Sequence, residues 1–78
     1  MDEHKLRRAF VDALDIEDDN VVDSLEYGTV KEWDSIGHMK LISEIELNFD
    51  IMIDTDDVIA MNTFGRAKDI VKKYSDEN

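Results

Sequence analysis

Three segments of the chain repeat their apolar residues at the spacing of an α-helix, and no other feature of the sequence restricts the fold as strongly. The first segment covers residues 2–14 and begins with two acids, which the positive end of a helix dipole favours. The second covers residues 35–49 and the third residues 63–74, and each starts beside a residue that can cap a helix. The apolar positions are Leu6, Ala9, Phe10, Ala13 and Leu14; Met39, Leu41, Ile42, Ile45 and Phe49; and Phe64, Ala67, Ile70, Val71 and Tyr74. The spacing therefore predicts three main helices.

The segments between these helices differ in length. Residues 15–34 lack helical periodicity and contain a polar cluster and Gly28, so they predict a long connection. Its apolar members, including Val21 and Leu25, indicate that it packs rather than remains disordered. The acids of residues 54–57 predict the start of a short third helix. Residues 1–78 therefore predict one domain of the all-α class, a small four-helix bundle with a long loop between helices 1 and 2 and a short third helix, ending in a frayed tail at residues 75–78.

Size and charge narrow the possible functions. A chain of 78 residues has room for one modest core, which disfavours an enzyme with a buried substrate cleft. Its 20 Asp and Glu against 9 Lys and Arg give a net charge of −11, which favours basic protein partners and predicts no nucleic-acid and no membrane partner. The chain has no Cys and no segment typical of a signal peptide, so we expect a cytoplasmic protein. We also expect a monomer.

The residues that could carry chemistry lie at the start of the second helix, in Trp33-Asp34-Ser35-Ile36-Gly37-His38-Met39. This segment resembles the acyl carrier proteins, which attach phosphopantetheine to the Ser of an Asp-Ser-Leu triplet at the same place. The resemblance covers most of the chain from about Leu25 to Tyr74, through Glu44-Ile45-Glu46, Phe49-Asp50-Ile51 and Thr63-Phe64. It implies a 4'-phosphopantetheine cofactor on Ser35, with Asp34 and Ile36 beside it. The implied partners are a phosphopantetheinyl transferase and the enzymes that load and accept acyl groups.

Elementary physics is consistent with a modification at this position. A phosphodiester on Ser35 would lie at a helix N-terminus, where free backbone N–H groups and the dipole favour an anion. In the family, the Asp at the position of Asp34 helps the transferase and its metal ion to engage the site. The alternative is that Asp34 or Ser35 serves only as a helix cap.

The chain also departs from the family pattern. Ile36 replaces the usual Leu and keeps an apolar side chain beside the arm. Lys40 stands where carriers of fatty acid synthesis typically have an acid, and Leu47 stands within a usually acidic run. These departures favour a specialised carrier, of polysaccharide or polyketide biosynthesis, over the carrier of fatty acid biosynthesis.

Two further features of the second helix give predictions. An outward stripe of Ile36, Lys40, Ser43 and Leu47 is predicted as the partner-docking face. An acyl pocket is predicted between the second and third helices, lined by Leu41, Ile45, Phe49, Ile53, Val58 and Met61. His38 has two interpretations: a half-buried residue whose ring bonds the long loop, or a residue at the mouth of that pocket. Met39, Met61 and Phe64 are predicted as core residues.

Two other functions are compatible with parts of the sequence. An aminoacyl or peptidyl carrier would use the same Ser35 chemistry. An EF-hand-like calcium protein would use the loop acids Asp15, Glu17, Asp19, Asp23 and Glu26, which match ligand positions 1, 3, 5, 9 and 12. Against calcium, Asn20 occupies the place of the turn glycine and Gly28 interrupts any exit helix. We therefore expect only weak, non-specific calcium binding and no metal site.

Overall fold

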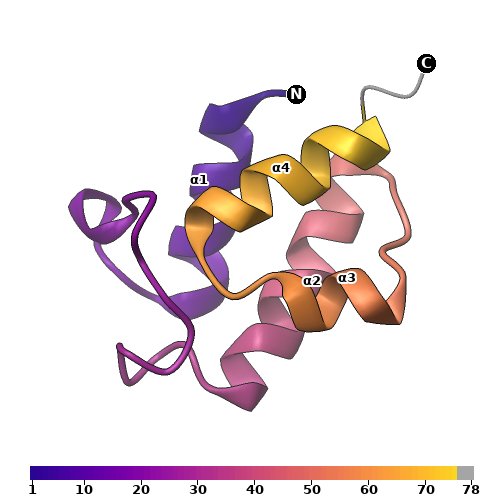
Figure 1. Cartoon of the computed structure of the whole chain (residues 1–78). Coiled ribbons are helices and arrows are strands. Elements are labelled where there is room, and N and C mark those ends of the chain that lie inside the picture. Colours follow the sequence, from indigo (N-terminus) through magenta and orange to yellow (C-terminus); the bar gives the residue numbers. More distant parts are fainter. Residues whose placement is uncertain (76–78) are drawn as a thin grey trace.

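Every helix expected from the apolar spacing is present in the computed structural model, which describes residues 1–75 (Figure 1). The elements are α1 (Glu3–Leu14), the 3-10 helix η1 (Asp18–Asn20), α2 (Ser35–Phe49), α3 (Thr55–Ala60) and α4 (Phe64–Ser75). The prediction of an all-helical fold with a short third helix is confirmed. Ser75 ends α4, and the rest of the predicted frayed tail, residues 76–78, lies outside the described residues.

The helix starts follow from their capping residues. Asp2 accepts a hydrogen bond from the Lys5 N–H at 3.3 Å, and Asp34 accepts one from the Gly37 N–H at 2.8 Å. The Thr63 hydroxyl accepts from the Arg66 N–H at 2.9 Å, so the cap expected for the last helix is confirmed. Each bond satisfies a donor that has no partner within its own helix, and such a cap contributes about 1 kcal/mol.

The core lies where α1, α2 and α4 face one another. Three aromatic rings occupy its centre: Phe10 of α1 contacts Trp33 edge to face at 5.3 Å and Phe64 of α4 at 5.0 Å. Trp33 belongs to the long connection, yet it is one of the largest fully buried side chains. The connection is therefore anchored in the core one residue before the Asp-Ser pair, which fixes where α2 begins.

The long connection packs against the helices, as its apolar residues predicted. Val21 and Leu25 are buried, and Arg7 of α1 and Lys68 of α4 pair with Asp18 and Asp23 at 3.2 and 2.7 Å. Its backbone also bonds that of the α3–α4 junction, since the Tyr27 N–H donates to the Asn62 carbonyl, the Phe64 N–H to the Leu25 carbonyl and the Gly65 N–H to the Asp23 carbonyl. The loop thus has a defined path.

Helix α3 has no fully buried residue, and polar contacts with α4 add to the packing of its half-buried Val58 and Ala60 against the core. Lys73 of α4 pairs with Asp57 at 2.7 Å, and the Tyr74 hydroxyl donates to the same carboxylate at 2.6 Å. These hydrogen bonds lower the pKa of Asp57, the Lys73 bond contributing most, because both favour the ionised carboxyl. The Asp54 N–H donates to the Tyr74 hydroxyl at 2.9 Å. The last turn of α4 therefore fixes the first turn of α3.

Within residues 1–75, no helix combines the length and the apolar character needed to cross a bilayer.

Candidate functional site

Ser35 is the first residue of α2 and its side chain is exposed. The preceding Trp33 is buried, and the following Ile36 keeps 68% of its surface exposed. The chain therefore turns from core to surface at this point and presents the Ser35 hydroxyl to solvent. A large partner can reach this hydroxyl without entering the protein.

The backbone around Ser35 suits an anion. Asp34 caps the N–H of Gly37, and the N–H of His38 donates to the Asp34 carbonyl at 2.8 Å. In the described part of the chain, the N–H groups of Ser35 and Ile36 have no hydrogen-bond partner. A phosphate ester on Ser35 would thus meet free donors at the positive end of a 15-residue helix. The residues present fit the phosphopantetheine group that the resemblance implies.

An apolar pocket of about 340 Å³ opens beside Ser35, between α2 and the segment of α3. Its lining residues are Tyr27, Ser35, His38, Met39, Val58, Ile59, Met61 and Asn62. Because Ser35 is part of the wall, a group attached to its hydroxyl starts at the edge of the pocket.

The predicted lining of this pocket is only partly correct. Val58 and Met61 line it, but Leu41 and Ile45 are fully buried in the core and Ile53 is nearly so. The half-buried Phe49 lies under the Lys5 ammonium of α1. The core fills the seam between the helices farther along α2, so the pocket stays at the N-terminal end. The core prediction is wrong for Met39, which is 61% exposed at the pocket wall.

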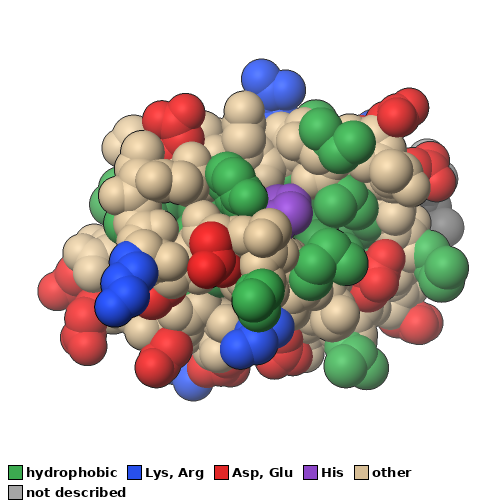
Figure 2. Space-filling view, turned by 90° about the horizontal axis from the view of Figure 1, so that it is seen from below, with side chains coloured by type: hydrophobic (Ala, Val, Ile, Leu, Met, Phe, Trp, Pro, Cys, Tyr) green, Lys and Arg blue, Asp and Glu red, His purple; other side chains and the backbone are tan. Residues whose placement is uncertain are grey.

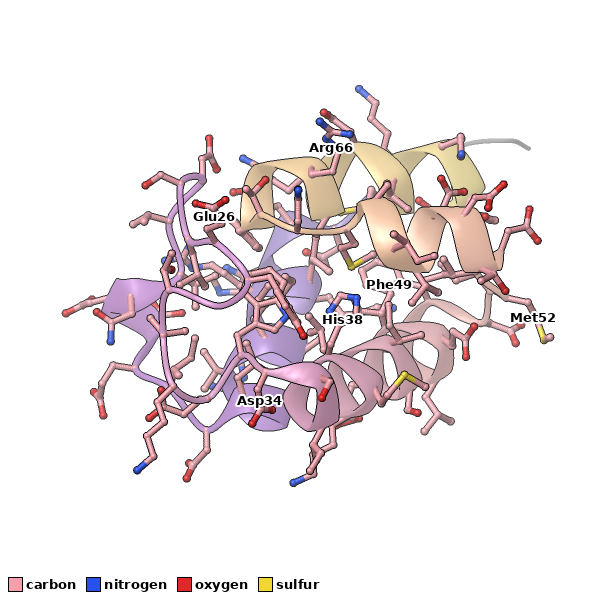
Figure 3. The ribbon with its side chains drawn as sticks, turned by 60° about the horizontal axis from the view of Figure 1, so that its bottom comes forward. Glu26, Asp34, His38, Phe49, Met52 and Arg66 are labelled. Carbon is pink, nitrogen blue, oxygen red and sulfur yellow. The ribbon has the colours of Figure 1, made fainter. Side chains whose placement is uncertain are left out.

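His38 bridges the long connection and α3 (Figure 3). Trp33 Nε1 donates to His38 Nδ1 at 2.9 Å, and His38 Nε2 lies 2.8 Å from the Val58 carbonyl oxygen. An indole nitrogen can only donate, so Nδ1 carries no proton and Nε2 donates to Val58. The first interpretation of His38 is confirmed, because its half-buried ring bonds Trp33 of the loop, and the ring also lines the pocket beside Ser35. With both nitrogens engaged, His38 is not placed to act as a base for Ser35.

Gly37 sets the contact between the first turn of α2 and the preceding loop. A Cβ at this position would lie far inside contact distance of the Glu32 carbonyl oxygen and 3.1 Å from Leu14 Cδ2. Only a residue without a side chain lets the helix start this close to the backbone of residue 32.

We therefore expect Gly37→Ala to destabilise the protein, by about 1–3 kcal/mol, because the backbone carbonyl cannot rotate away as a flexible side chain would. In an unstrained helix the same change stabilises by up to about 1 kcal/mol. Urea unfolding measures the difference, with Gly65→Ala in α4 as the control, where the closest atom would be Asp23 O at 3.3 Å. Equal free energies of unfolding for the Gly37→Ala and Gly65→Ala variants would contradict the close contact between Gly37 and the Glu32 carbonyl.

The acidic loop does not form an EF-hand. Glu26, which would begin the exit helix, forms an isolated backbone bridge with Thr63 instead. The Asp23 carboxylate is held by Lys68, and Gly28 adopts φ 87°. Among residues 1–75, no three His, Cys, Asp or Glu side chains come together as a potential metal site.

The predicted stripe on α2 does face outward. Ile36 and Leu47 are 68% and 78% exposed, and Lys40 and Ser43 are exposed between them. No ion pair holds Lys40 within the described residues. The stripe is therefore available for contact along the full length of the helix.

Comparison of the chain with models of known protein families gives no match, and a search of curated proteins also gives none.

Several residues of the site were not predicted from the sequence. Tyr27, Ile59 and Asn62 complete the pocket wall. Trp33 bonds His38 in that wall, and Gly37 lets the first turn of α2 approach the backbone of residue 32. Trp33, Gly37 and His38 lie close to Ser35 in the sequence, and this clustering is the signal that could have indicated their part in the site. The sequence gives no such signal for Tyr27 and Asn62, because a backbone hydrogen bond between these two residues, far apart in the chain, brings them together.

Proposed function

We propose that this protein is an acyl carrier protein, in which Ser35 bears a 4'-phosphopantetheine arm. The observation that carries the proposal is the exposed Ser35 hydroxyl at the start of α2, at the edge of an apolar pocket. When attached, the arm supplies a thiol on which acyl groups are held as thioesters. The chain itself presents the hydroxyl, provides the anion-favouring helix start and offers the pocket.

The loading step needs an external enzyme. A phosphopantetheinyl transferase removes the proton of the Ser35 hydroxyl, and the oxygen attacks the β-phosphorus of coenzyme A. A new P–O bond to Ser35 forms, the pyrophosphate P–O bond breaks, and adenosine 3',5'-bisphosphate leaves. The chain offers no base for this step at His38, since both ring nitrogens are engaged.

The pocket favours acyl cargo over aminoacyl or peptidyl cargo. Its wall consists mainly of apolar side chains from Met39, Val58, Ile59 and Met61. A charged α-amino group placed there would lose its hydration without gaining a carboxylate partner, whereas a hydrocarbon chain would be stabilised by burial. Lys40 and Leu47 support a specialised carrier, of polysaccharide or polyketide biosynthesis, over one of fatty acid biosynthesis.

Intact mass spectrometry tests the proposal. After incubation of the purified chain with coenzyme A and a broad-specificity phosphopantetheinyl transferase, we expect its mass to increase by one phosphopantetheinyl group. The same reaction without transferase is the control. An unchanged mass with active transferase would overturn the proposed function.

A further inference from the structure

The His38 ring lies between the indole of Trp33 in the long connection and the backbone of Val58 in α3. It is half-buried in the wall of the pocket. In Figure 3 it lies between the ribbons of α2 and α3, and Figure 2 shows a His side chain reaching the surface among apolar side chains. Imidazole is the side chain that ordinarily titrates between about pH 5 and 8. The group that joins α3 to α2 is therefore of the kind that changes charge near neutral pH.

The contact with Trp33 requires a neutral imidazole. Trp33 Nε1 is only a donor, and it needs the lone pair of His38 Nδ1, 2.9 Å away. A protonated imidazole carries an N–H on both nitrogens, so two donors would face each other at this contact. Trp33 cannot move aside, because its side chain is fully buried and packs edge to face against Phe10. The ring that must move is His38, which is open to solvent on the pocket side.

The surroundings of His38 do not compensate a positive charge. Among the pocket-lining residues of the described chain there is no Asp, Glu, Lys or Arg. The other titratable group in the wall is the Tyr27 phenol, whose ring centre lies 5.5 Å from that of His38. On α2 the Asp34 carboxylate caps the helix, and on α3 the Asp57 carboxylate is held by α4. A charged imidazole is therefore better solvated by water than in this contact.

Helix α3 is joined to α2 and to α4 by contacts that respond differently to acid. Within residues 1–75, the His38–Val58 bond is the one hydrogen bond between α2 and α3. The α4 contact uses the ionised Asp57 carboxyl, which accepts from Lys73 and Tyr74. These bonds lower the pKa of Asp57, the Lys73 bond most, so the α4 contact persists through the imidazole range and is lost only in stronger acid. Acid therefore affects the α2 contact first.

We propose that protonation of His38 detaches α3 from α2, so that the pocket wall supplied by α3 is held in place at neutral pH and moves away as the pH falls. His38 leaves both Trp33 and the Val58 carbonyl, while Asp57 keeps α3 attached to α4. Val58 and Ile59, which line the pocket, move with the helix. The open form binds one proton more than the closed form, so opening becomes about tenfold more favourable for each unit that the pH falls through the titration. This opening does not depend on the phosphopantetheine arm.

Amide hydrogen exchange of the unmodified chain, followed by nuclear magnetic resonance from about pH 7.5 to about pH 5.5, tests the opening. The Val58 and Met61 amides, which bond the carbonyls of Asp54 and Asp57, report on α3. After correction for the intrinsic pH dependence of exchange, we expect their protection to fall about tenfold or more, while protection in α1 stays constant. The His38 ring should titrate over the same range. Unchanged protection in α3, an equal loss in α1 and α3, or a ring that stays neutral would each overturn the proposal.

His38→Gln separates this opening from other effects of acid, because a Gln amide can donate to the Val58 carbonyl but does not titrate. We expect α3 protection in this variant to be independent of pH. His4→Gln is the matched control, since His4 is exposed in α1, and it should keep the wild-type response. A pH response that persists in His38→Gln would overturn the proposal. If that variant does not fold, His4→Gln decides, because His38 is then the one His of the chain: equal midpoints for its ring and for α3 exchange support the proposal, and different midpoints overturn it.

Discussion

Replacing Ser35 by Ala is expected to abolish phosphopantetheine attachment completely. The transfer forms a bond to the Ser35 oxygen, and Ala offers no nucleophile in its place. The fold should persist, because Ser35 is exposed and the cap of α2 is provided by Asp34 rather than by Ser35. Intact mass after reaction with coenzyme A and transferase measures the loss, and circular dichroism confirms the helical content.

Ser43→Ala provides the matched control for this experiment. Ser43 is exposed on the same helix but lies in its third turn, without an acidic neighbour before it or free backbone donors at a helix start. We expect this variant to gain the full mass increment, as the wild type does. Continued modification of the Ser35→Ala variant would show that another residue carries the arm, and the assignment of Ser35 would be wrong.

The helices were predictable because local signals agree with one another. In α2, the cap at Asp34, the apolar spacing and the end near Phe49 all lie within one segment, and the observed helix is Ser35–Phe49. The same agreement holds for α4, which begins after its predicted Thr63 cap. Local chemistry determines such boundaries without reference to the rest of the chain.

The pocket was less predictable because it depends on tertiary contacts. Helical periodicity places Leu41 and Ile45 on the inner face of α2, but it does not say whether a core or a cavity lies opposite them. The observed pocket forms where α3 is kept on α2 by His38 and on α4 by Asp57. Both contacts join residues more than 15 positions apart, since their sequence separations are 20 and 16. No local sequence pattern predicts these two contacts.

The largest unexpected feature is the central place of Trp33. An isolated Trp in an aperiodic loop gives no indication of which face it takes, and here it is fully buried against Phe10 and bonded to His38. This arrangement connects three parts of the protein: the core, the start of α2 and, through His38, the backbone of α3. The position of the candidate attachment site thus depends on the same residues that shape the pocket.

His38→Phe is expected to destabilise the protein by about 2–4 kcal/mol. Phe keeps a planar aromatic ring at this position but removes both hydrogen bonds, which leaves the buried Trp33 Nε1–H without an acceptor and the Val58 carbonyl without its donor. For a domain of this size the midpoint of thermal unfolding should fall by about 10 °C or more. His4→Phe is the matched control, because it makes the same change at an exposed position of α1.

Nuclear magnetic resonance separates a local role of His38 from a general loss of stability. In the wild type, we expect the neutral Nε2–H tautomer of His38, since Trp33 donates to Nδ1 and Nε2 donates to Val58. In His38→Phe, the Trp33 indole proton should shift and amide exchange should accelerate first in α3, which has no fully buried residue to hold it. A wild-type Nδ1–H tautomer, or equal acceleration in α1 and α3, would show that His38 does not fasten α3 over the pocket beside Ser35.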